Sequence, residues 1–369
     1  MYRIDLSEYK EDTLYFKYFD ILLKNDYINK EQRLEELNIA PSSYRRARLY
    51  HTKSSKNYFN ILSSYYKVKL LNIDDISSLE EYLNHIYLDV FYKVSDNFDN
   101  HITRIAEMIE ENTIFTPVLK LFLLFLKANQ YKNLKNIIEN TKKEYRELLS
   151  FKEFFSINLK EICTIIELII ANNPKEVKLE VNYQSALIYY LFSSKFYLNN
   201  EPFNSLYCAS KARELLINEN NYKRIIDLNL IVIANYNLIR NYNEALKLSN
   251  EQIRVLKAFG YVKTEYSATK THLYVSLLGL KKFEVLYKEM EIISITDAVI
   301  KYVTLFFIKN INFENEEKDI LIKCPKALVY LDNIKSIASN KTNKANHMVL
   351  DNMNIRNGLK DIIRDLFIK

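Results

Sequence analysis

Apolar residues recur along almost the whole chain at the spacing of amphipathic helices, and short polar breaks separate one helical stretch from the next. Only three glycines and five prolines stand among the 369 residues. Folds that are rich in β-strands or doubly wound around a sheet need many tight turns, whereas long helices with short connections need few. The pattern therefore predicts an all-α fold.

Two short helices joined by a tight turn are expected near the start of the chain, after an amphipathic helix over residues 7–24. Asn29 is a favourable N-cap for a helix that begins at Lys30. Asn38 stands where this helix must stop, and Asn tolerates the left-handed backbone that such a turn requires. Pro41 opens the next helix, where its missing N–H costs nothing. This order predicts a helix-turn-helix.

The second helix of this pair carries the candidate DNA contacts. Tyr44 and Ala47 are spaced to face the core, which leaves other side chains to face outward or sideways, namely Ser42, Ser43, Arg45, Arg46 and Arg48. From Leu37 to Ile73 the chain has seven Lys and Arg residues, including Lys53 and Lys56, and no Asp or Glu. Arg pairs bidentately with guanine, and Lys neutralises phosphate. The module is predicted to read the major groove of double-stranded DNA, and a basic bundle that contacts only solvent is the alternative.

A recurrent helical hairpin follows farther along the chain. Each of four copies has an apolar helix, a short polar break, an aromatic residue, and then Leu or Ala three places on. The aromatic residues are Tyr131, Phe203, Tyr242 and Phe283, and a large apolar residue stands six places before each, namely Phe125, Tyr197, Tyr236 and Leu277. The last three copies lie 39 and 41 residues apart. Such a period predicts a degenerate solenoid like that of tetratricopeptide repeats (TPR), with a generic α-helical solenoid as the alternative.

These patterns divide the chain into three parts. Residues 1–73 are expected to form the helix-turn-helix module, residues 74–296 the TPR-like domain, and residues 297–369 a C-terminal helical segment. The last helix of that segment is amphipathic, with Leu359, Ile362 and Ile363 on its apolar side. It is expected either to cap the open end of the solenoid or to pair with a second copy of the chain.

The first helix of each stacked hairpin lines the inner surface of a solenoid. We counted along the first helix of each hairpin from its packed apolar residue. Six residues are thereby predicted to bind a ligand on that surface, namely Lys195, Asp227, Asn235, Asn237, Thr271 and His272. Asn235 and Asn237 are the leading candidates, because an Asn amide both donates and accepts hydrogen bonds, as the backbone of an extended peptide requires. Asn is abundant throughout this chain, so a purely structural role for both is the alternative.

Motifs for catalysis or cofactor binding are absent from the sequence. Gly260, Gly279 and Gly358 are its only glycines, which excludes the glycine-rich phosphate loops of Walker and Rossmann type. Its three cysteines lie far apart, and its five histidines have no HExxH or HxH spacing. His85 and His101 are therefore expected to be surface or structural residues. The sequence predicts no enzyme, no metal site and no cofactor.

Membrane insertion and secretion are not expected. The longest apolar run, over residues 118–126, is interrupted by Lys120 and is too short to span a bilayer. The start MYRIDLSEYKED carries acidic residues where a signal peptide would have an apolar segment. The chain is expected to be cytoplasmic.

The segment NIAPSSYRRAR and the four hairpins, among which NYNEAL looks like the start of helix B of a TPR unit, together resemble one family. This family is the RRNPP group of peptide-sensing transcription regulators from low-GC Gram-positive bacteria and their phages, which includes the arbitrium receptors. The resemblance implies a quorum-sensing homodimer in which a short signalling peptide binds the concave TPR face and changes how the dimer holds DNA. It places Arg45 and Arg46 with their neighbours at the DNA, and Asn235 and Asn237 at the peptide. A TPR-like adaptor that binds a protein partner without contacting DNA is the alternative.

Overall fold

The computed structural model describes residues 2–10, 12–50, 55–130, 135–180, 182–260, 263–339 and 343–368. Within these ranges the chain forms helices and no strands, apart from one parallel bridge between Lys69 and Thr113. It divides into two compact units, Met1–Phe192 and Ser193–Lys369. The predicted all-α fold is confirmed, whereas the division at residues 73 and 296 stays a prediction. None of the described helices is long and apolar enough to cross a membrane.

The first unit begins with four short helices around a small aromatic core. They are α1 (Asp12–Lys24), α2 (Lys30–Glu36), α3 (Pro41–Tyr50) and α4 (Ser55–Tyr66). The expected single helix over residues 7–24 is instead a 3-10 helix (Ser7–Lys10) followed by α1. The ring of Phe16 joins the helices, because its centroid lies 5.3 Å from that of Tyr44 and 4.7 Å from that of Phe59. One residue from each of α1, α3 and α4 thus meets in the core.

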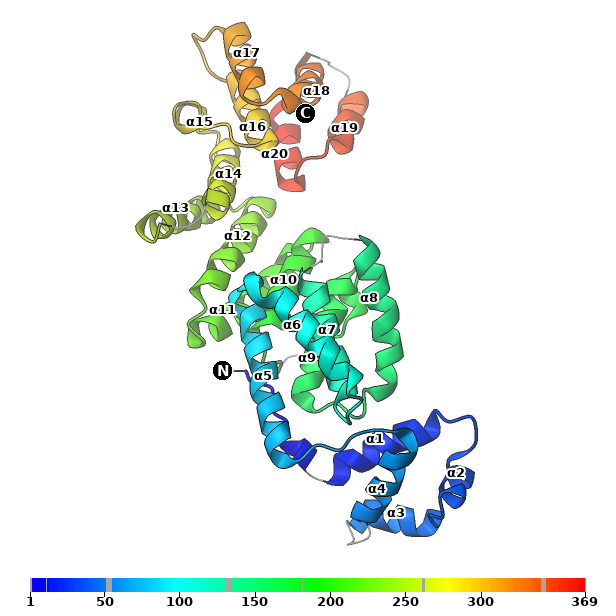
Figure 1. The fold of residues 1–369 in the computed structure, drawn as a ribbon. Coiled ribbons are helices and arrows are strands. Elements are labelled where there is room, and N and C mark those ends of the chain that lie inside the picture. Colours follow the sequence, from blue (N-terminus) through cyan, green and yellow to red (C-terminus); the bar gives the residue numbers. More distant parts are fainter. Residues whose placement is uncertain are drawn as a thin grey trace. The chain divides into compact units, whose positions relative to one another are not determined.

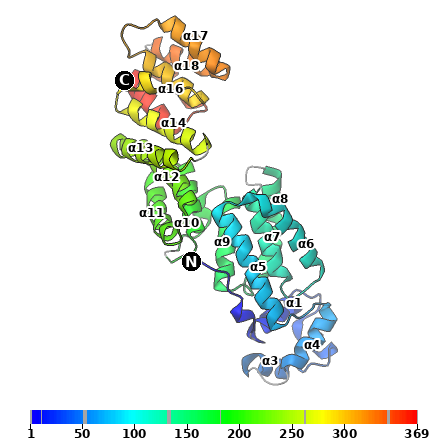
Figure 2. The same cartoon turned by 60° about the vertical axis from the view of Figure 1, so that its left-hand side comes forward.

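Two sets of contacts hold the four-helix module on the rest of its unit. One set is made by residues that precede α1, and the other by a residue of α1 itself. The hydroxyl of Tyr9 donates to the carbonyl of Phe154 at 2.9 Å. The Tyr18 ring, on α1, packs against those of Phe151 and Phe154. The chain start is held on α5, since the Ile4 N–H donates to the side chain of Asn84. Figure 1 and Figure 2 both show α1–α4 together beside one end of the larger bundle of this unit.

That bundle consists of α5 (Ile73–Tyr92), α6 (Phe98–Glu110), α7 (Thr116–Gln130), α8 (Lys135–Leu148), α9 (Ile157–Ile170) and the first part of α10 (Ala186–Leu198). Helix α7 lies at its centre and contacts α5, α6, α8 and α9. Its sequence explains this position, because it is apolar around nearly its whole circumference. Tyr131 and Leu134, which belong to the first predicted hairpin, lie outside the described residues.

The second unit is built on four successive helices of equal length, each of 17 residues. They are α11 (Pro202–Asn218), α12 (Tyr222–Leu238), α13 (Tyr242–Ala258) and α14 (Lys263–Gly279), and Figure 2 shows them following one another in a stack. A left-handed residue stands at each described break before, between or after them, namely Asn200, Asn220, Arg240, Gly260 and Lys281. The repeat of the sequence is thus a pair of helices, each ended by one left-handed residue.

The same hydrogen bond closes four of these breaks, and the three that lie inside hairpins show how the hairpins align. An N–H just after the left-handed residue donates to a carbonyl five residues back. Inside the hairpins it runs from Glu201 to Phe196, from Asn241 to Tyr236 and from Lys282 to Leu277, and between two hairpins it runs from Asn221 to Leu216. The predicted positions Tyr197 and Phe203 of the second hairpin are therefore each one residue off. The equivalent positions are Phe196, which is buried, and Pro202, which begins α11. Phe203 is consequently 73% exposed.

Helices two apart in the stack also contact each other, as α12 contacts α14 and α14 contacts α16 (Ile295–Leu305). Gly279 permits the close packing of α13 on α14, since a Cβ atom there would lie 2.6 Å from the ring of Tyr242. Buried polar side chains link helices at several levels. For example, the Asn235 amide nitrogen donates to the Ser205 hydroxyl at 2.7 Å. The helices are thereby held in a specific register and not only by apolar contact.

The remaining helices of the second unit follow the stack, and the last of them returns to it. They are α15 (Phe283–Glu289), α17 (Phe313–Lys323), α18 (Leu328–Ser339), α19 (Asn343–Asn352) and α20 (Asn357–Phe367). Helix α20 buries Leu359, Ile362 and Ile363 and contacts α12 and α14. The apolar side of the C-terminal helix thus packs on helices of its own unit, whereas capping of the open end of the solenoid stays a prediction. Pairing with a second copy stays a prediction.

Candidate functional sites

The helix-turn-helix forms as its local sequence predicts. The Asn29 side chain accepts the N–H of Gln32 at 2.9 Å, as an N-cap does. Asn38 has a φ of 57°, and the next N–H, that of Ile39, donates back to the carbonyl of Leu34 at 2.8 Å. Both apolar residues, Leu34 and Ile39, are buried. The predicted cap and left-handed turn, and the start of the next helix at Pro41, are confirmed.

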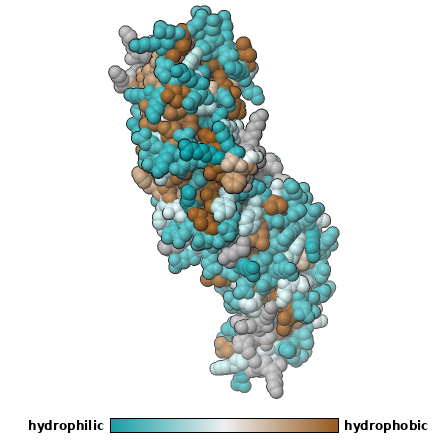
Figure 3. Space-filling view, turned by 90° about the vertical axis from the view of Figure 1, so that its left-hand side faces the viewer, coloured by the Kyte–Doolittle hydropathy of each residue, from teal (hydrophilic) through white to brown (hydrophobic). Residues whose placement is uncertain are grey.

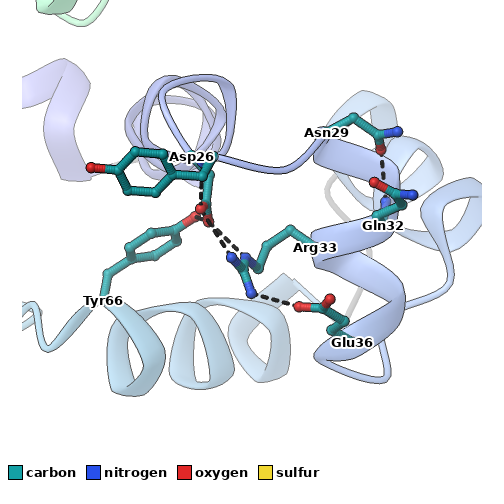
Figure 4. Close-up of polar contacts among 7 residues, drawn as sticks. Asp26, Asn29, Gln32, Arg33, Glu36 and Tyr66 are labelled. Atoms are coloured by element: carbon teal, nitrogen blue, oxygen red, sulfur yellow. Dashed lines mark hydrogen bonds and ion pairs between the residues drawn. The ribbon is translucent and has the colours of Figure 1, made fainter.

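An ion-pair network fixes α2 on the helices beside it (Figure 4). The Arg33 guanidinium donates through two nitrogens to the Asp26 carboxylate, at 2.6 and 2.9 Å, and through the third to Glu36. The Tyr66 hydroxyl, at the end of α4, donates to the same Asp26 carboxylate at 3.2 Å. The guanidinium beside Asp26 holds the pKa of that carboxyl below its ordinary value. This arginine is therefore committed to structure and not to a ligand.

The exposed side of α3 carries the predicted DNA contacts. Tyr44 and Ala47 are buried, and all five residues predicted to face outward or sideways are exposed, namely Ser42, Ser43, Arg45, Arg46 and Arg48. Arg48 is not free, because its guanidinium lies 2.7 Å from the Asp20 carboxylate, which also binds Lys30. Within the described part of the chain, no carboxylate lies within ion-pairing distance of Arg45 or Arg46. Lys56 is exposed on α4, and Lys53 lies outside the described residues.

A hollow of about 480 Å³ in the second unit lies on the side of α12 and α14 where a ligand groove was predicted. Asn237 and His272 line it, as do Tyr197, at the end of α10, and Val275. Another part of its wall is the segment 354–359, which joins α19 to α20. This segment was not among the predicted ligand residues, because nothing local in the sequence indicates that the C-terminal helix returns to α12.

The other predicted ligand residues do not line this hollow. Asn235 is fully buried and donates to the Ser205 hydroxyl and to the Ile231 carbonyl. The Thr271 hydroxyl donates to the Asp297 carboxylate at 2.8 Å. Lys195 and Asp227 are partly buried. Counting from helix positions fails here because neighbours cover α12 and α14 on several sides, so a residue that points away from one helix meets the next.

Asn237 faces the hollow, yet its amide is already used within the fold. It donates to the His272 carbonyl at 3.1 Å and accepts from the Ser276 hydroxyl at 2.8 Å. Arg356 supplies the charge of the hollow, and its guanidinium donates to Nε2 of His272 at 2.6 Å. Burial and the positive charge of Arg356 lower the pKa of His272 to about 3, so the ring is a neutral acceptor at pH 7. A ligand in this hollow would meet the positive charge of Arg356.

Comparison of the chain with models of protein families, with curated proteins and with solved structures found no match. Any inference about its function therefore rests on the chemistry and geometry of its own residues.

Proposed function

We propose that this chain is a cytoplasmic transcription regulator that inserts α3 into the major groove of double-stranded DNA. One observation supports this most strongly. Of the four arginines on α2 and α3, Arg33 and Arg48 are held by carboxylates, whereas Arg45 and Arg46 are exposed without such a partner among the described residues. Unpaired guanidinium groups on the second helix of a helix-turn-helix suit bidentate contacts with guanine.

The surroundings of these arginines suit the same role. Ser42 and Ser43 lie in the first turn of α3, where a recognition helix contacts base edges or phosphate. The exposed Lys56 on α4 adds a cation that would neutralise phosphate. Helix-turn-helix proteins commonly bind as dimers, with two recognition helices about one DNA turn apart. We propose a homodimer on a palindromic site.

The second unit is proposed to bind a short signalling peptide in the hollow between α12, α14 and the segment 354–359. Arg356 would pair with a carboxylate of the peptide, and Asn237 and His272 would keep the wall in place. Because the wall includes the chain's own C-terminal segment, a bound peptide would shift α20 relative to α12 and α14. That movement is the proposed link from peptide to DNA binding.

A specific surface favours the adaptor alternative. Ile217, Tyr222, Val255 and Phe259 are exposed around a second hollow of about 690 Å³ between α11, α12 and α13. Apolar side chains gathered in this way are typical of protein-binding surfaces. In the space-filling view, brown apolar patches interrupt the mostly hydrophilic face of the molecule (Figure 3). An adaptor would use such a surface to capture a protein and would leave α3 without DNA.

DNA binding by Arg45→Ala/Arg46→Ala tests the proposal. Fluorescence anisotropy would use labelled fragments from upstream of the chain's own gene. The wild-type chain is expected to bind one fragment with an affinity that falls steeply with salt. The double variant is expected to lose specific binding, and Arg254→Ala/Lys257→Ala, which removes two exposed charges from α13, is expected to keep it. Failure of the wild-type chain to bind any fragment at low salt would favour the adaptor.

A further inference from the structure

Two histidines and an aspartate from separate parts of the sequence meet in the first unit. His85 and Asp89 stand four residues apart, on one face of α5, and His101 lies on α6. One nitrogen from each ring and one carboxylate oxygen lie within 4.8 Å of one another. Nothing local in the sequence joins them, because the fifteen residues between the histidines include the end of α5 and a 3-10 helix.

Two of the three side chains are already held in place. Asp89 and His101 are each 7% exposed, and Nε2 of His101 lies 2.9 Å from Oδ2 of Asp89. The amide of Asn97 donates to the same carboxylate oxygen at 3.1 Å. The Tyr82 hydroxyl lies 3.2 Å from Nδ1, the other ring nitrogen of His101. Hydrogen bonds of this kind orient metal-binding side chains in proteins and fix which ring nitrogen binds.

The third side chain, that of His85, lies on the solvent side of the other two and can complete the ligand set from there. His85 is exposed, and its ring centroid lies 5.5 Å from that of His101. Both rings border an open hollow of about 950 Å³ that also includes Glu81 and Arg104. An ion could enter through this hollow, and the sides not taken by protein atoms would remain open to water or to a small anion.

We propose that His85, Asp89 and His101 bind a divalent transition metal ion, with Zn²⁺ as the best match. Two imidazoles and one carboxylate form a ligand set that zinc accepts, whereas Mg²⁺ and Ca²⁺ prefer oxygen ligands throughout. The ion replaces the bond between Asp89 and His101 with a coordinate bond to each. The proton of the His101 ring then stands on Nδ1, from which it donates to Tyr82. The ion would join α5 to α6, and this site is independent of the proposed function in DNA binding.

Cobalt titration of the full chain tests the site. Tag-free protein, treated with a chelator and dialysed, would be titrated with Co²⁺ while its visible d–d absorption is recorded. We expect saturation at one equivalent, and loss of the absorption when Zn²⁺ is added. His85→Ala is expected to weaken Co²⁺ binding by more than about tenfold, since loss of even an outer hydrogen-bond partner costs that much. Its side chain is exposed, so the variant should fold, as circular dichroism would check.

His347→Ala is the matched control, because it removes a histidine of the second unit and should leave Co²⁺ affinity unchanged. Asp89→Asn is the second variant, which keeps the shape of the side chain and weakens the carboxylate ligand. Saturable binding that both His85→Ala and Asp89→Asn weaken would support the site. Lack of saturation in the wild-type chain, or equal affinity in wild type and His85→Ala, would overturn it.

Discussion

Helices α3 and α12 were both predicted to present polar side chains to a ligand, but only those of α3 are exposed in the structure. On α3 the predicted inward residues, Tyr44 and Ala47, are buried, and the polar residues between them are exposed. On α12 both leading candidates, Asn235 and Asn237, are buried and bonded to neighbouring helices. A short helix at the edge of a small module has one covered side, whereas a helix inside a stack is covered on several. Helical periodicity alone therefore locates an exposed face only in the first case.

The largest expected effect concerns the covered side of α3. Tyr44→Ala would remove a ring that is 1% exposed and packs against Phe16. We expect the module to lose about 3–5 kcal/mol of stability, as large-to-small changes in cores do. Ser43→Ala, on the exposed side, should change stability by less than about 0.5 kcal/mol. Urea unfolding followed by hydrogen exchange in α1–α4 would measure both, and similar values for the two variants would contradict the assigned faces.

Lowering the pH should reduce the stability contributions of His272 and Asp26 over different pH ranges. His272, in the second unit, has its pKa lowered from 6.5 to about 3, so the unfolded chain binds a proton there that the folded chain does not. Its contribution to stability is full above pH 6.5, should fall by about 1.4 kcal/mol for each pH unit between 6.5 and about 3, and is lost below that. Asp26, in the first unit, has a pKa below 3.8, so its contribution is full above pH 3.8 and is lost only in stronger acid.

His272→Asn tests this difference, since it removes the titrating group and keeps an acceptor for Arg356. Urea unfolding at pH 7 and pH 5, with hydrogen exchange read in α12 and α14, should show a smaller pH dependence in the variant than in the wild-type chain. His347→Asn serves as the control and should behave like wild type. An unchanged pH dependence in His272→Asn would show that His272 is not the group responsible.

Asn235→Ala would decide whether that amide serves structure or a ligand. We expect a loss of about 1–3 kcal/mol, because the buried Ser205 oxygen loses the amide N–H that donates to it and keeps only its bonds to the carbonyl and hydroxyl of Ser193. Asn243→Ala, at an exposed position at the start of α13, is the matched control and should change stability by less than about 0.5 kcal/mol. Urea unfolding with hydrogen exchange in α11 and α12 gives the comparison. Unchanged stability together with lost ligand binding would restore the original prediction for Asn235.

The smallest effect is expected at the cap of α2. Asn29→Ala would leave the N–H of Gln32 without its side-chain acceptor, at a cost of about 0.5–2 kcal/mol. Asn29→Ser should recover most of that stability, because Ser is also a good N-cap. Urea unfolding of the two variants measures the difference. If Asn29→Ser is as unstable as Asn29→Ala, the cap does not explain the role of Asn29.

Local sequence determined the helices, their caps and several turns. The all-α class, the N-cap at Asn29, the left-handed Asn38 and the start of α3 at Pro41 all depend on interactions within a few residues, and each was predicted. The repeat of helical hairpins was also readable, because it follows from the spacing of apolar residues and polar breaks. The one-residue error in the second hairpin arose because Phe203 resembled a buried aromatic position, although the helix begins one residue earlier, at Pro202.

Tertiary structure alone decided which polar groups meet. The return of α20 to α12 and α14 brings Arg356 to His272, eighty-four residues apart. The packing of α5 on α6 brings His85 and Asp89 to His101, and the fold of the small module pairs Arg48 with Asp20 but leaves Arg45 and Arg46 exposed. Such contacts depend on how whole helices pack, which the period of one helix does not specify. Backbone propensity acts within a turn or two of helix, whereas a site is made by side chains that only the complete fold brings together.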